Sequence, residues 1–353
     1  DRIATASLTV KGAARLRIGM ADPYVRHDSH ILVGVESDQG TSVAPTRGFG
    51  KVSGDTDLPD PSIDWLEERS ITGGGNRELT GKYAGQNTYE GGSIPIVPVD
   101  GFPVALAFGN DTVTADTNLD DSGSETSETG TTLHTIDVLN NSIPPTVTVE
   151  AAMFGRGTGS DFVRTFEGAA PPSVSIEVDN ESRLNTDLDL LAMGVTEGDS
   201  PTTGVSADTR DPWLFDDVVS DLSINGNTYC RVTDFSHELT TNVDPRHYIC
   251  SSSGRDPFEI LYANAEHETT ATVTPTDDQL FNDLLGADDA GDANIQFKKP
   301  STGEVFRFEA TSIGLEEAGH PIPEEGAVEV DVTLIPNSAQ IKVTDTEATS
   351  AYV

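Results

Sequence analysis

Alternating apolar and polar residues near the carboxyl end of the chain predict a long β-hairpin. Two runs, residues 305–309 and 328–334, carry an apolar side chain at every second position, and a segment rich in Gly, Pro and Glu joins them. Such alternation is typical of a strand with one buried face. We expect a buried face of Phe306, Phe308, Val328, Val330, Val332 and Leu334, and a solvent face of Arg307, Glu309, Glu329, Asp331 and Thr333.

The same plan occurs about 140 residues earlier in the chain. Residues 161–192 contain a short apolar run and then two alternating runs on either side of a turn. The sequence pattern therefore predicts a duplicated structural unit. It predicts an all-β fold with a minor helical part, in which two tandem units, 1–198 and 213–353, are joined by a polar linker at 199–212.

Two segments are candidates for helices, one in each half. Residues 277–285 place their apolar side chains on one face, begin with acidic capping residues and end before a glycine, so they predict a helix. Residues 102–108 are short and apolar, which fits either a strand or a helix. We expect exposed loops at 110–132, an acidic insertion without periodicity, and at the Pro-rich segment 55–64.

Acidic residues outnumber basic ones by 59 to 21, which gives a formal net charge of -38 over 353 residues. Such a charge destabilises a compact state by self-repulsion at low salt, whereas molar salt screens it over roughly 3 Å. The composition therefore indicates a protein of an extreme halophile. It argues against a protein that grips DNA or RNA, because such affinity begins with cations that neutralise phosphates. No apolar run is long enough for a membrane span, so we expect no membrane partner.

The strongest candidates for a metal site are two pairs of carboxylates, Asp187 with Asp189 and Glu329 with Asp331. Side chains two apart in a strand share a face, and Ca²⁺ prefers oxygen ligands. No glycine-bent loop with spaced acids accompanies either pair, so the favoured interpretation is the solvent face of an amphipathic strand. The acids of residues 120–125 also depart from the spacing of a calcium loop.

Two short stretches begin like catalytic motifs and then depart from them. Residues 267–270 begin like a zinc-protease helix, but Ala271 stands where the second His is needed, and residues 75–82 have one residue too many for a phosphate loop. We therefore expect a protein without enzymatic activity, and no catalytic residue, metal or cofactor. Cys230 and Cys250 lie in adjacent predicted strands but are not opposite each other, so free thiols are favoured over a disulfide.

Several stretches resemble, in order, the major tail tube proteins of long-tailed viruses of bacteria and archaea. Residues 31–47 resemble that family's opening strand with its Gly/Pro turn. Residues 77–81 and 268–285 resemble its paired segments of a strand followed by an acidic helix. Residues 229–258 and 304–336 resemble its second repeat. The extreme acidity departs from most bacterial members and suggests a virus of a haloarchaeon.

The resemblance implies two tandem tail-tube domains, each a β-sandwich with one short flanking helix that adds strands to a continuous barrel. Family members with two such domains form trimeric rings with pseudo-sixfold symmetry, and those with one form hexamers. Duplication therefore implies homotrimers, with hexamers as the alternative. Stacked rings would form the tube through which DNA passes without sticking. The implied partners are further copies of the chain and other tail proteins such as the tape measure and terminator, in a virion tail assembled in the host cytoplasm.

The resemblance and the alternation together suggest two sets of functional residues. The polar face of the hairpins is expected to line the channel, although an exterior position for this face is the competing assignment: Ser175, Glu177, Asp187, Asp189, Glu309, Glu329, Asp331 and Thr333. The loop between the second pair of strands is expected to contact the next ring: Glu316, Glu317, His320, Pro321, Glu324 and Glu325. The rival function is a halophilic cell-surface β-sandwich or adhesin-like structural protein.

Overall fold

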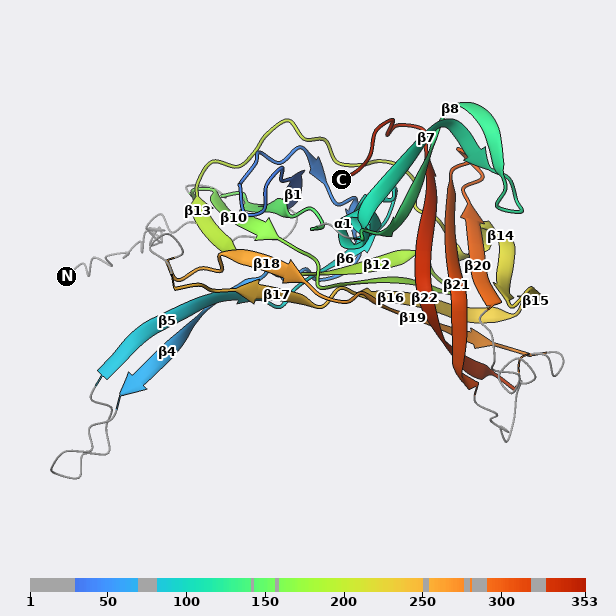
Figure 1. Ribbon diagram of the computed structural model, residues 1–353. Helices are drawn as coiled ribbons and strands as arrows, with labels where there is room; N and C mark the ends of the chain where they lie inside the picture. Colours follow the sequence, from blue (N-terminus) through green and yellow to red (C-terminus); the bar gives the residue numbers. More distant parts are fainter. Residues whose placement is uncertain are drawn as a thin grey trace, which may run out of the picture.

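The protein is nearly all β, as predicted, with one α-helix among the described residues (Figure 1). The strands form two large sheets and two separate two-stranded ribbons. The computed structural model describes residues 29–68, 81–140, 143–155, 159–249, 254–275, 280, 291–318 and 328–353.

One large sheet has five strands and belongs to the first half of the chain. Its order is β13-β10-β9-β1-β2, and every described pairing in it is antiparallel. Its apolar side chains, such as Val149 and Phe166, join the main core. The strands are β1 (Ser29–Val35), β2 (Arg47–Gly48), β9 (Val147–Met153), β10 (Phe162–Ala169) and β13 (Gly194–Gly198).

The second large sheet has thirteen strands and draws on both halves of the chain. Eleven of them follow the order β15-β14-β20-β21-β22-β19-β16-β11-β12-β6-β3, while β8 pairs with β22 and β7 pairs with β8. The strands are β3 (Lys51–Val52), β6 (Gly92–Val97), β7 (Gly109–Leu119), β8 (Glu125–Val138), β11 (Ser173–Asp179), β12 (Asn185–Leu190), β14 (Val218–Ile224), β15 (Asn227–Tyr229), β16 (Val232–Thr240), β19 (Glu266–Val273), β20 (Gly291–Lys298), β21 (Val305–Ala318) and β22 (Val330–Asp345).

Two groups of four strands in this sheet have the same connectivity. In both β21-β22-β19-β16 and β11-β12-β6-β3, a hairpin comes first, its second strand pairs with an earlier strand, and that strand pairs with a still earlier one. The groups meet where β16 pairs with β11. The pairing pattern is therefore repeated along one continuous sheet. The domain limits 1–198 and 213–353, with the linker at 199–212, stay a prediction.

The hairpin predicted near the carboxyl end is β21 with β22, and it is longer than expected. Of the six apolar residues assigned to its buried face, Phe306, Phe308, Val330, Val332 and Leu334 are buried. Val328 is exposed instead, because it lies before β22 begins. Arg307, expected to face solvent, is buried under the tip of the β7–β8 hairpin, where a Cβ on Gly123 would come within 2.2 Å of its guanidinium carbon.

The expectation of a loop at 110–132 was wrong, because most of this stretch forms the hairpin β7–β8 (Figure 1). β8 adds to the sheet by pairing with β22, with Ile136 opposite Ile341. The Asp120 carboxylate closes the tip by accepting hydrogen bonds from the backbone amides of Ser122 and Ser124, both at 2.9 Å. A strand that pairs with an existing sheet edge is stabilised by its neighbours, so the absence of its own amphipathic pattern was misleading.

The two separate ribbons are inserted at corresponding points of the two repeated groups. β4 (Asp60–Glu68) and β5 (Gly81–Glu90) lie between β3 and β6 in the chain, while β17 (Val243–Arg246) and β18 (Glu259–Tyr262) lie between β16 and β19. The irregular segment expected at 55–64 is therefore a strand from Asp60 onward. The ribbons touch at the base of β5, where Tyr89 donates a 2.6 Å hydrogen bond to Asp256.

The helix α1 (Phe102–Phe108) fills the space between the sheets, and all seven of its residues are buried. Pro lies in its first turn and Gly109 ends it in a left-handed conformation, φ 83°, as at many helix ends. The apolar segment 102–108, which fitted either a strand or a helix, is therefore a helix. The helix predicted at 277–285 lies outside the described residues except for Leu280, which is buried. Within the described ranges a short 3₁₀ turn at Phe215–Asp217 is also present.

An ionic cluster fixes the segment that connects the two repeats. The guanidinium of Arg210 lies 2.6 Å from Asp100, 2.6 Å from Asp208 and 3.0 Å from Asp345. Asp100 precedes α1 and Asp345 ends β22, and both are buried. The backbone oxygen of Arg210 also accepts a 2.5 Å hydrogen bond from Lys51. The connecting segment is thus held against parts of both halves.

Candidate channel-lining surface

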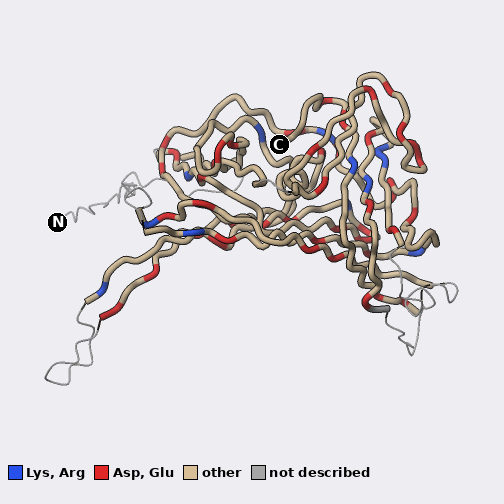
Figure 2. Tube along the Cα trace, in the orientation of Figure 1, with Lys and Arg blue, Asp and Glu red and all other residues tan. Residues whose placement is uncertain are grey.

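The polar face of the thirteen-stranded sheet is built from five neighbouring strands. Along β12, β11, β16, β19 and the first part of β22, alternate side chains are buried in the core and the others point away from it. The outward side chains form what we call the acidic face: Ser173, Ser175, Glu177, Asp187, Asp189, Asp234, Ser236, Glu238, Glu266, Glu268, Thr270, Thr272, Asp331 and Thr333. None of them is cationic, and acidic positions recur along these strands in Figure 2.

Strand register brings these side chains side by side across the two halves of the chain. Ser175 lies opposite Asp187 on one side and opposite Glu238 on the other. Hydroxyls and carboxylates bond each other where they meet: Thr272 donates a 2.8 Å hydrogen bond to Asp331, and Ser173 donates a 2.6 Å bond to Asp189. The acidic face is therefore one hydrated surface that crosses the junction of the repeats.

The carboxylates on this face are close enough to shift one another's titration. Partial desolvation raises the pKa of Glu177, and the charge of Asp187 raises it further. Desolvation and the charge of Asp189 likewise raise the pKa of Asp187. Desolvation followed by the charges of Asp179 and Asp331 raises the pKa of Asp234. Mutual repulsion of this kind is the electrostatic signature of a dense anionic surface.

The structure brings together six of the eight side chains that the sequence suggested for the channel. Ser175, Glu177, Asp187, Asp189, Asp331 and Thr333 belong to the acidic face. Glu329 is exposed just before β22 begins.

Glu309 lies in a different setting from the other seven. It is half-buried and accepts hydrogen bonds from Arg307, from Gln340 at 2.6 Å and from Lys342 at 2.9 Å. Arg307 and Lys342 neutralise its charge, and Gln340 completes a local network on β21 and β22. Glu309 therefore joins a structural polar cluster rather than the run of carboxylates on the acidic face.

The residues suggested for ring contacts are only partly described. Glu316 is exposed near the end of β21, and Glu317 belongs to the same strand. The other four, His320, Pro321, Glu324 and Glu325, lie outside the described residues.

Sequence reasoning missed half of the acidic face, on β16 and β19. Asp234, Ser236 and Glu238 alternate with buried residues, as do Glu266 and Glu268 on the next strand. The signal was weak, because polar residues occupy inward positions of these strands: His237, His267 and Thr269. The sequence search followed the repeated hairpins, in which the inward positions are mostly apolar.

The β4–β5 ribbon is a second surface of functional interest. It extends away from the rest of the described fold (Figure 1), and every residue of β4 is exposed. Four large apolar side chains on it are 42–57% exposed: Ile63, Trp65, Leu66 and Tyr83. A two-stranded ribbon with such a surface is marginally stable alone in water, so these side chains are candidates for a contact site.

Among the residues that the structure describes, no group of three or more His, Cys, Asp or Glu side chains suits a metal ion. Within the same residues, no helix has the length and apolar character to cross a membrane.

An all-β fold with a repeated sheet, one continuous anionic face and a projecting apolar ribbon defines a structural protein that is built to assemble. Residues 26–336 match the family described as phage tail tube protein, and the chain belongs to this family. No curated protein matches the chain. Membership makes it a structural component of the virion tail, one that assembles with itself and with other tail proteins into a tube.

Proposed function

We propose that three copies of the chain form a ring and that stacked rings form the tail tube. The observation that supports this best is the repeated group of four strands, joined edge to edge in one sheet. Each chain then supplies eight strands with an internal pseudo-twofold repeat, so three chains supply a barrel of 24 strands with pseudo-sixfold symmetry. A barrel of that many strands is wide enough for a channel, because barrel diameter grows with strand number.

The acidic face lines that channel. Carboxylates repel the phosphates of DNA, and hydroxyls between them hold water, so DNA passes without sticking. In molar salt the repulsion reaches only roughly 3 Å, and hydration of the wall then contributes more than its long-range field. Six of the residues suggested from the sequence take part, with Asp234, Glu238 and Glu268 in addition, while Glu309 acts inside the fold.

Rings contact each other through two hairpins, β4–β5 and β21–β22. The apolar side chains of the β4–β5 ribbon pack against the next ring, and the segment 316–326, which begins at the end of β21, provides a second contact. A head-to-tail interface of this kind does not close on itself and produces an open polymer. The tape measure fills the channel during assembly and the terminator ends the tube.

The virus infects a haloarchaeon, and the tail is assembled in that host's cytoplasm. The support is the net charge of -38, which suits a protein that folds at molar salt. Lower salt is expected to weaken both the fold and the assembly.

Electron microscopy of the purified chain in molar salt tests this proposal. Trimeric rings and stacked tubes are the expected particles, and a reconstruction should place Asp187 and Glu238 on the inner wall. Sixfold rings of six chains would overturn the trimer. A map with the acidic face on the outside of the tube would overturn the channel assignment.

A further inference from the structure

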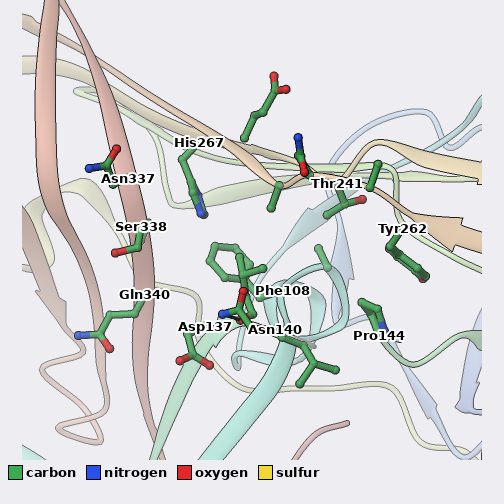
Figure 3. Close-up of a pocket in the computed structure, with 18 of the residues that line it drawn as sticks. Phe108, Asp137, Asn140, Pro144, Thr241, Tyr262, His267, Asn337, Ser338 and Gln340 are labelled. Atoms are coloured by element: carbon green, nitrogen blue, oxygen red, sulfur yellow. Dashed lines mark hydrogen bonds between the residues drawn. The ribbon is translucent and has the colours of Figure 1, made fainter. Parts of the chain in front are cut away.

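The sheet divides into a fork at β22, and this fork holds a cavity. On one side β22 pairs with β21 along most of its length, but on the other it has two partners in succession. β19 pairs with residues 330–334 and β8 pairs with residues 340–345, which leaves the stretch between them without a partner strand on that side among the described residues. A cavity of about 1070 Å³ lies in the opening (Figure 3).

The cavity has an apolar floor and polar walls. At the floor Phe108 of α1 packs against His267, with 6.0 Å between the ring centroids (Figure 3), and the exposed side chain of Ile143 adds apolar surface. The polar walls include the side chains of Asn140, Thr241 and Gln340 (Figure 3).

The shape of the cavity favours an extended polypeptide over a small molecule. Its volume is at the upper limit of roughly 300–1,000 Å³ for small-molecule sites, which are also mostly apolar. Pairing between β19 and β22 ends at Thr269 and Leu334, whereas β19 continues to pair with β16 as far as Glu266. The backbone edge of residues 266–268 therefore faces the fork. A strand added to such an edge gains main-chain hydrogen bonds and seats alternate side chains in the cavity.

The charge of the lining indicates what kind of strand fits. Asp137 and Glu266 are among the lining residues, Glu309 is already paired with Arg307 and Lys342, and none of the lining residues is Lys or Arg. The chain itself contains one matching segment. Residues 8–18, LTVKGAARLRI, carry Lys11, Arg15 and Arg17 with no acidic residue, in a chain whose net charge is -38. They lie outside the described residues.

Alternation in this segment separates its apolar and cationic side chains. Leu8, Val10, Leu16 and Ile18 occupy one face of an extended strand, and the three cations occupy the other. The acidic face of the sheet would attract the cations but has no apolar surface for the opposite side. The fork offers both, an apolar floor and carboxylates at its walls.

We propose that residues 8–18 of a neighbouring copy add as a strand to the fork between β19 and β22. This inference rests on the proposed assembly of copies into a tube. The apolar side chains pack against the apolar lining of the cavity, and the cations pair with Glu266 and Asp137. The amino-terminal segment thereby ties adjacent copies together.

Disulfide trapping in assembled protein tests the proposal. In a chain with Cys230→Ser and Cys250→Ser, one population carries Lys11→Cys and another carries Ser338→Cys, a lining residue at the mouth of the cavity. The two are mixed, assembled in molar salt and oxidised with diamide. We expect cross-linked dimers, and none when Ser236→Cys on the acidic face replaces Ser338→Cys. Because each copy has one cysteine, a dimer requires contact between copies.

The outcomes separate this inference from the proposed function. Normal tubes without the Ser338 cross-link would overturn strand addition while the tube proposal stands. A cross-link that forms only within one chain, in the variant carrying both cysteines, would overturn the neighbouring copy as its source. Cross-linking to Ser236 instead would place the segment on the acidic face. A protein that forms no rings or tubes, and no Ser338 cross-link, would contradict both proposals.

Discussion

Glu238 of β16 lies directly opposite Glu268 of β19, so two carboxylates face each other on adjacent antiparallel strands. Like charges in this position destabilise a sheet. Their place in the middle of the acidic face indicates that the surface is kept anionic at a cost in stability. In the proposed channel this arrangement keeps the wall repellent to phosphates, and salt compensates for the repulsion within the wall.

Glu268→Gln should therefore stabilise the fold at low salt and have little effect in molar salt. We expect a gain of about 0.2–1 kcal/mol in the free energy of unfolding at low salt, the range for a cross-strand pair, and its loss when the screening length falls to roughly 3 Å. Urea denaturation at the two salt concentrations measures it. Glu266→Gln is the matched control, because Glu266 lies on the same strand opposite Thr240. Equal gains for both variants would contradict the pairwise origin.

Asp187→Asn should stabilise the protein at neutral pH and lose this effect in acid. The folded state raises the pKa of Asp187, so the native protein binds its proton more tightly than the unfolded chain does. Stability from this group is therefore present at low pH and falls as pH rises through the raised pKa, which lies above the ordinary value of about 4. Thermal unfolding of both proteins at low salt from pH 3 to 8 measures the difference. A gain that is independent of pH would rule out the carboxylate as its cause.

Arg210→Ala should strongly destabilise the fold. It removes a cation from beside Asp100 and Asp345, which are buried, and breaking a buried ion pair from one side costs about 3–5 kcal/mol. Chemical denaturation in molar salt checks this. The control is Arg164→Ala, whose ion pair with Glu197 is solvent-exposed and is worth about 1 kcal/mol or less. Similar losses for the two variants would show that the Arg210 cluster does not stabilise the fold.

The repeat could be predicted from the sequence because its hairpins alternate, but its full extent could not. In the first half two strands, β10 and β11, are separated by Pro171 and Pro172. In the second half one strand, β21, spans the corresponding region, with an irregular register around Ser312, a non-glycine residue with φ 54°. Local alternation carries no signal for a bulge of this kind. Equivalent parts of the two halves therefore look different in sequence.

The polar residues of the candidate surfaces could be predicted where buried and exposed side chains alternate along a strand. They could not be predicted where contact with another strand determines whether a side chain is buried. Asp187 and Asp331 follow from the pattern of their own strands. The burial of Arg307 depends instead on the β7–β8 hairpin, which is distant in sequence and without amphipathic pattern. Alternation likewise does not predict the fork at β22. The fork arises because two different strands, β19 and β8, pair with successive parts of β22 on the same side.

Gly123→Ala should destabilise the packing of the β7–β8 tip on β21. Gly123 has φ 83°, and a Cβ there would clash with the guanidinium of Arg307, which is buried and held by hydrogen bonds to Glu309 and Gln296. Gly130→Ala is the matched control, since Gly130 has φ 86° but nothing within 4 Å of the added Cβ. Both variants carry the roughly 1–2 kcal/mol of a left-handed alanine, so a further loss of about 1–3 kcal/mol from overpacking is expected for Gly123→Ala alone. Equal losses in urea denaturation would show that the Arg307 side chain moves away freely.

Leu66→Ser with Tyr83→Ser should abolish tube formation without unfolding the chain. The two residues lie opposite each other on the β4–β5 ribbon and are 57% and 56% exposed, so they contribute little to the core. If the ribbon packs against the next ring, their loss removes the apolar centre of that interface, where a few residues carry most of the binding energy. The double variant should therefore keep the wild-type melting temperature and remain as single rings or free chains in sedimentation and electron microscopy.

The control for this pair is Leu214→Ser with Val219→Ser, two apolar residues that are 42% and 39% exposed near the start of β14. It removes a comparable exposed apolar surface, so a general effect of surface polarity on solubility or polymerisation would appear in both variants. Tubes in the control but not in the ribbon variant would assign the stacking contact to β4–β5. Tubes of normal length from the ribbon variant would contradict a stacking contact at β4–β5. The segment between β21 and β22, the second contact proposed between rings, would then be assigned that contact.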